Sequence, residues 1–131
     1  MTALPITLLS AAAAVGLNIW LGYRIANLRE LHKVSVGDGG HDALLRRMRA
    51  QSNYIENAPF FLILLGALES SGGDFSILAA AAVIFFLARI AHAIGMDGGV
   101  VQRWRTIGMA GQMIALIALA IYALIKAIGA L

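Results

Sequence analysis

Long apolar stretches separated by short polar segments set the pattern of this chain. They cover residues 3–23, 43–70, 75–95 and 104–128, and the second of them begins with a basic segment. At about 1.5 Å per residue, each is long enough as a helix to cross about 30 Å of hydrocarbon. The pattern predicts an all-α fold, an integral membrane four-helix bundle that forms a single domain over residues 1–131.

The first apolar stretch admits a second interpretation, a secretory signal peptide. Such a peptide has Lys or Arg ahead of a shorter apolar core. Here no charged side chain precedes the run, whereas Arg24, Arg29 and Lys33 follow it. We therefore interpret residues 3–23 as an uncleaved membrane helix, in which Asn18 forms an interhelical hydrogen bond.

The polar segments between the stretches are rich in residues that form turns. Residues 34–41 form a predicted loop before a helix capped by Asp42, residues 71–74 a tight hairpin, and residues 97–99 the start of a second loop. Within the second stretch, Pro59 removes a backbone donor and is expected to kink the helix.

The second stretch carries a polar stripe. At about 100° per residue its members fall within an arc roughly 100° wide, which leaves Arg47 and Gln51 outside. In hydrocarbon each charge costs about 2.5–3.5 kcal/mol at the centre of a helix. The stripe must therefore face other helices, water or a ligand. Its members are Asp42, Arg46, Arg49, Asn53, Glu56 and Asn57.

The third stretch brings a charge into an apolar region. Phe85, Arg89, His92 and Met96 fall on one helical face, and Arg89 is the deepest positive charge of this stretch. An arginine at membrane depth needs a partner. We expect that partner to be Glu56, in a pair that is either functional or purely structural, and we expect His92 to be either a packing residue or part of a site.

The fourth stretch has a seam of small residues suited to close helix packing. The seam consists of Gly108, Gly111, Ala115 and Ala118. Trp104 and Tyr122 mark the two expected membrane interfaces.

Composition agrees with a membrane protein and narrows the chemistry. Of the 131 residues, 60% are hydrophobic and only 13% are charged, whereas a soluble domain carries about 25% charged residues. The absence of cysteine excludes disulfides and thiolate metal sites, so any thiol must come from a substrate. Three scattered histidines form no metal motif, and we expect no metal. The expected partners include membrane lipids but no nucleic acid.

The placement of charge predicts the orientation. Arg103 and Arg105 lie before the fourth stretch, and the hairpin at residues 71–74 has no Lys or Arg. The positive-inside rule puts both basic loops in the cytoplasm and both termini outside. The first loop and its flanks contain Arg24, Arg29, Lys33, Arg46, Arg47 and Arg49.

These residues gather into a predicted basic pocket at the cytoplasmic interface. Arginines bind carboxylates through two parallel hydrogen bonds and a glutamate binds an ammonium group, so the pocket suits an anion that also carries an amine. Alternatively, basic residues around the first loop serve only topology and lipid headgroups, namely Arg24, Arg29, Lys33, Arg46 and Arg47. The pocket residues are Arg46, Arg49, Asn53, Glu56, Arg89, His92, Arg103 and Arg105.

Residues 49–59, Arg-Ala-Gln-Ser-Asn-Tyr-Ile-Glu-Asn-Ala-Pro, resemble the signature of the MAPEG family, the membrane-associated proteins in eicosanoid and glutathione metabolism. Residues 31–40 and 88–96 are similar to the bacterial branch, and the latter also to microsomal glutathione transferase. The resemblance extends over essentially the whole chain. It implies a homotrimer with active sites between neighbouring subunits. With the orientation predicted from charge, we expect the protein in the bacterial inner membrane, with the active sites on the cytoplasmic side.

The resemblance also implies that the protein is a glutathione transferase with glutathione as its co-substrate. A glutathione peroxidase activity is also possible in this family. An arginine just before the fourth helix would stabilise the thiolate; Arg105 fits best, while ungapped counting favours Arg103. The thiolate would attack a hydrophobic electrophile or a lipid hydroperoxide arriving from the bilayer. The implied glutathione-binding residues are Arg49, Gln51, Asn53, Glu56, Arg89 and His92.

Three positions depart from the eicosanoid members of the family. Asn57, His92 and Met96 stand where those members have tyrosine. Because of these departures, a small thiol other than glutathione is an alternative substrate, and a leukotriene-forming role is disfavoured. A non-catalytic membrane scaffold or anionic lipid-binding protein is the alternative; a small transporter would need broken helices or rings of charge.

Overall fold

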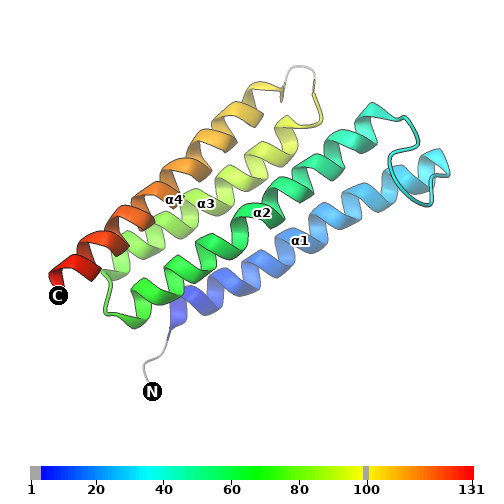
Figure 1. Cartoon of the computed structure of the whole chain (residues 1–131). Helices are drawn as coiled ribbons and strands as arrows, with labels where there is room; N and C mark the ends of the chain where they lie inside the picture. Colours follow the sequence, from blue (N-terminus) through cyan, green and yellow to red (C-terminus); the bar gives the residue numbers. More distant parts are fainter. Residues whose placement is uncertain (1–3, 99–100) are drawn as a thin grey trace.

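The structure is a computed structural model that describes residues 4–98 and 101–131. Within these ranges it consists of four helices without strands. They run alongside one another as an elongated bundle (Figure 1). The all-α prediction is confirmed, whereas residues 3 and 99, at the edges of two predicted segments, lie outside the described residues. The helices are α1 (Pro5–His32), α2 (Asp42–Ser70), α3 (Phe75–Gly95) and α4 (Arg103–Gly129).

The helix bounds follow the sequence pattern except at one end. α1 continues beyond the apolar run to His32, and Lys33 then ends it in the left-handed conformation with φ 55°. Hydropathy therefore identified only the apolar part of α1. Asp42 is the first residue of α2 rather than its cap, which is His41; a carboxylate there still favours the helix dipole. Pro59 lies inside α2, and its kink stays a prediction.

Among the described helices, α1, α3 and α4 are long and apolar enough to cross a membrane. α2 does not meet that standard because its first half carries the polar stripe. A charged face on one helix, surrounded by apolar helices, is stable when that face lines a site inside the bundle.

α3 and α4 approach each other closely because glycine lies at their contact. A Cβ on Gly108 would collide with the backbone of Ala88 and His92, and one on Gly111 would lie 2.9 Å from the Ala88 Cβ. Ala115 is also buried in this seam, as predicted. Ala118 is exposed because it turns off the contact face, so its inclusion in the seam was wrong. The face is completed by Gln112 and Leu119.

Side chains join the helices at the end of the bundle that contains the α2–α3 hairpin, called here the hairpin end (Figure 1). Glu69 accepts hydrogen bonds from the backbone N–H groups of Ile6 at 2.9 Å and Thr7 at 2.7 Å, at the start of α1. Lys126 on α4 donates to the carbonyls of Ser71 at 2.8 Å and Gly72 at 3.0 Å. These bonds fasten both termini of the helical region to the hairpin.

One carboxylate joins the helices at the opposite end, called here the loop end. Asp97 pairs with Arg24 of α1 at 2.5 Å and with Arg47 of α2 at 3.1 Å. Arg24 also donates to the carbonyl of Ala93 at 3.1 Å. The alternative interpretation of Arg24 and Arg47 as purely topological charges is therefore wrong, because both bind groups inside the chain.

We expect Asp97→Asn to lower the stability of the folded bundle. Arg24 is nearly buried, so losing its charged partner leaves a cation with weaker compensation, at a cost of about 1–3 kcal/mol. Thermal unfolding of the detergent-solubilised protein measures the change. Glu30→Gln, which removes an exposed carboxylate of α1, is the matched control; equal melting of the two variants would contradict the role of Asp97.

Candidate functional site

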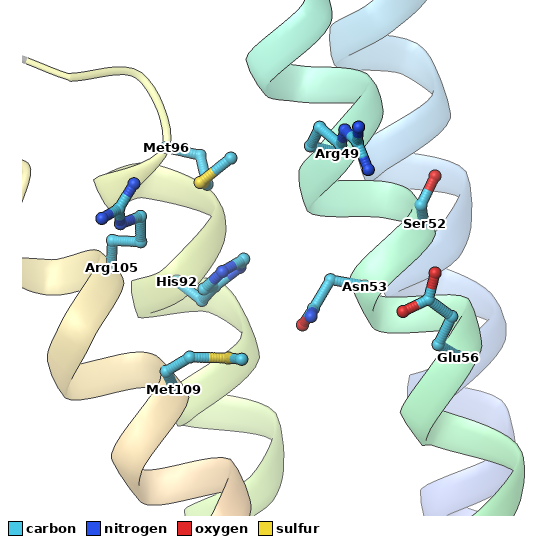
Figure 2. Close-up of a pocket in the computed structure, with 8 residues that line it drawn as sticks. All are labelled: Arg49, Ser52, Asn53, Glu56, His92, Met96, Arg105 and Met109. Carbon is cyan, nitrogen blue, oxygen red and sulfur yellow. The ribbon is translucent and has the colours of Figure 1, made fainter.

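A cavity of about 380 Å³ opens between α2 on one side and α3 with α4 on the other. We call it the polar pocket. Figure 2 shows the side chains of α2 facing those of α3 and α4 across it. Its lining combines cationic, anionic and amide groups with two thioethers. The lining residues are Arg49, Ser52, Asn53, Glu56, His92, Met96, Arg105 and Met109.

The helical period explains why α2 presents these groups together. Arg49, Asn53 and Glu56 recur at the spacing of one helix face. The opposite face buries Tyr54 and Phe61 in the bundle core. Three of the six residues of the predicted polar stripe therefore line this cavity, whereas Asp42, Arg46 and Asn57 do not.

Gln51 lies outside the polar pocket. Its Nε2 donates to the Asn18 side chain of α1 at 3.3 Å. The helical projection placed Gln51 outside the polar stripe, and the structure agrees with that placement. The predicted interhelical hydrogen bond of Asn18 is confirmed.

Arg89 is buried behind the pocket rather than in its wall, with 2% of its surface exposed. It donates to Oε1 of Gln112 and lies 3.1 Å, measured from Nη2, from His92 Nδ1. The predicted Glu56–Arg89 pair is wrong. Arg89 projects toward α4, whereas Glu56 is exposed on the α2 wall, and Asp97 is the acceptor in both ion pairs of the described residues.

The structure favours Arg105 over Arg103 as the pocket arginine. Arg105 lines the polar pocket and also a neighbouring cavity of about 330 Å³, which it shares with Arg46 and Gln102. Arg103 lines neither cavity. Arg105 also lies in the first turn of α4, where the helix dipole adds to the attraction for an anion.

Three residues around the site were missed by sequence reasoning. Ser52 and Met109 line the pocket, and Gln112 holds Arg89. Each had a detectable sign: Ser52 lies three residues after Arg49, Met109 lies four after Arg105, and Gln112 interrupts the apolar run of α4.

A second, apolar cavity of about 550 Å³ lies between α3 and α4 and is lined in part by Ala91, Trp104 and Ile107. Its surface suits a lipid-soluble molecule. Within the described part of the chain, no group of three or more His, Cys, Asp or Glu side chains is arranged to hold a metal ion.

Comparison with known families gives a match over most of the chain. The model of the MAPEG family matches residues 7–125, nearly the whole chain. No curated protein matches the chain. The matched region contains every residue that lines the polar pocket.

Proposed function

Because the chain belongs to the MAPEG family, we propose that it is a membrane-bound glutathione transferase that also reduces lipid hydroperoxides. Family membership and the three apolar helices make it an integral membrane protein of eicosanoid or glutathione metabolism. The observation that carries the finer proposal is the polar pocket, in which Arg49, Asn53 and Glu56 face Arg105.

The lining of the polar pocket matches the groups of glutathione. The tripeptide has two carboxylates, an ammonium group, two peptide bonds and a thiol. Arg49 suits a carboxylate because a guanidinium donates two parallel hydrogen bonds. Glu56 suits the ammonium group, and the Asn53 amide suits a peptide unit.

Arg105 is the residue that activates the thiol. A free cysteine thiol has a pKa of about 8.5, and a neighbouring arginine lowers it. Each unit of lowering corresponds to about 1.4 kcal/mol of thiolate stabilisation. The proton leaves to water at the loop end, and the guanidinium remains beside the sulfur anion.

The thiolate then reacts in one of two ways. With an electrophile, its sulfur forms a bond to carbon, and the leaving group departs with the displaced electron pair. With a lipid hydroperoxide, the sulfur attacks the terminal oxygen, the O–O bond breaks, and the lipid alkoxide leaves and takes a proton from water to become the alcohol. The resulting sulfenic acid condenses with a second glutathione to give the disulfide and water.

We propose that the active form is a homotrimer in a bacterial inner membrane, in which a neighbouring subunit completes each polar pocket, so that the sites lie between neighbouring subunits. Both basic loops lie at the loop end (Figure 1), in agreement with a cytoplasmic location of that end. Glutathione would then enter from the cytoplasm, and the electrophile from the bilayer through an apolar cavity such as that beside Trp104.

Ultraviolet difference absorbance tests thiol activation directly. Detergent-purified protein at neutral pH is mixed with glutathione or with S-methylglutathione, which has no ionisable thiol. We expect a thiolate band with glutathione alone. A folded protein that produces no band with glutathione or other small thiols would contradict the proposal and favour the non-catalytic, anionic lipid-binding alternative.

We expect Glu56→Gln to weaken glutathione binding about 10- to 100-fold, because a hydrogen bond between charged groups contributes about 1.5–3 kcal/mol. Isothermal titration measures the change. The matched control is a glutathione analogue without the amino group, which should bind both proteins equally. A similar loss with this analogue would show that Glu56 does not act through the ammonium group.

A further inference from the structure

A chain of hydrogen bonds runs from the core of the bundle to the wall of the polar pocket. Gln112 of α4 accepts from Arg89 of α3, and the other terminal nitrogen of Arg89 lies 3.1 Å from His92 Nδ1. Arg89 and Gln112 are 2% and 0% exposed. Only His92 of the three lines the pocket.

The chemistry of these groups fixes the direction of the chain. A guanidinium has donors and no acceptor, so its bond to His92 requires a lone pair on Nδ1. The neutral imidazole then carries its proton on Nε2. His92 therefore offers the pocket an N–H donor and has no free lone pair on its ring.

Gln112 holds the guanidinium in this arrangement. Its Oε1 accepts one donor of Arg89, and the burial of both side chains keeps Arg89 away from the cavity. A buried polar group is costly to leave unpaired, which favours the bonded geometry. Arg89 thus acts on the pocket through His92 rather than on a ligand.

The opposite wall supplies the complementary group. Figure 2 shows Asn53 and His92 projecting toward one another from α2 and α3. The Oδ1 atom of Asn53 is buried and has no hydrogen-bond partner among the described residues. An acceptor on one wall and a donor on the other match the N–H and C=O of a peptide unit lying across the pocket.

We propose that His92 donates a hydrogen bond through Nε2–H to a carbonyl oxygen of the bound thiol peptide, and that Arg89 and Gln112 are positioning residues that keep its proton on Nε2. The tautomer part stands on the geometry alone. The ligand part rests on the proposed function, because it takes the polar pocket as the site of the thiol peptide.

Nitrogen NMR of the histidine-labelled protein in detergent tests the tautomer. The chain has three histidines, and the His92 signals are those that disappear in His92→Gln. We expect a neutral His92 ring with its proton on Nε2 at neutral pH. In Arg89→Met, or in Gln112→Leu if Arg89→Met does not fold, we expect both neutral tautomers of His92 to be populated. A wild-type ring that is doubly protonated, or protonated on Nδ1, would overturn the proposal.

Two substitutions of His92 by side chains that end in an amide test the ligand part. His92→Gln keeps an N–H near the position of Nε2, whereas His92→Asn has its donor near Nδ1 and cannot reach. We expect glutathione affinity within about threefold of wild type for His92→Gln and about five- to tenfold weaker for His92→Asn. Equal affinity of the two variants would overturn the donor role.

The outcomes separate this inference from the proposed function. Glutathione binding that distinguishes the two variants supports the donor even if no thiolate forms. Failure of the wild type to bind glutathione, with the Nε2–H tautomer observed, overturns the ligand part and retains the positioning role of Arg89 and Gln112.

Discussion

Replacing Arg105 with methionine is expected to abolish the thiolate band and to lower glutathione-transfer turnover about 100- to 1000-fold, the usual effect of removing one stabilising group at a developing anion. Methionine keeps much of the length of the side chain and removes its charge. Arg105 is exposed in the pocket wall, so little packing is lost and the bundle should melt near the wild-type temperature. Turnover with a soluble model electrophile and ultraviolet difference absorbance measure the two effects.

Arg103→Met is the matched control. Arg103 is exposed and begins the same helix two residues earlier, but it lines neither cavity beside Arg105. We expect this variant to keep the thiolate band and most of the turnover. A larger loss in Arg103→Met than in Arg105→Met would reverse the assignment that the geometry favours.

Gly108→Ala is expected to cost about 1–3 kcal/mol of stability and to disrupt the polar pocket as well. The added Cβ would overlap backbone atoms of Ala88 and His92, which cannot rotate away. α4 must therefore shift from α3, and such overpacking costs energy in this range. The shift moves Arg105 and Met109 relative to His92, so glutathione binding should weaken together with thermal stability.

Gly16→Ala provides the control for helix propensity. Gly16 lies within α1, and a Cβ there would meet nothing within 4 Å. Alanine in a helix interior is favoured over glycine by about 0.5–1 kcal/mol, so this variant should melt at or above the wild-type temperature. Equal melting temperatures of the Gly108→Ala and Gly16→Ala proteins would contradict the close contact of α3 and α4.

Much of the fold followed from properties that a single segment carries. Apolar length identified the helices, glycine-rich segments marked their connections, and the period of α2 put Arg49, Asn53 and Glu56 on one face. That face lines the polar pocket because a charged stripe within apolar helices has few other stable places. Local pattern was sufficient at each of these points.

Contacts between helices were harder to predict. The partner of Arg89 depends on the rotation of α3 relative to α2 and α4, which is why the sequence analysis expected Glu56 of α2 whereas the partner is Gln112 of α4. The pairing of Arg24 with Asp97 joins residues far apart in the chain. Such rotations are set by packing of whole helix surfaces, including the glycines between α3 and α4.

The two ends of the bundle are held differently, and this has a consequence for its dynamics. Glu69 and Lys126 attach α1 and α4 to the hairpin through several backbone groups. At the loop end, the bonds of Arg24 and Arg47 to Asp97 and to backbone carbonyls join α1, α2 and the end of α3, and within the described residues they do not include α4. Local opening of a protein begins where such bonds are fewest. Amide hydrogen exchange should therefore be faster near the polar pocket than near the hairpin. Ligand entry and fraying of the bundle would then be the same motion, so a substitution at Asp97 would change the rate of both.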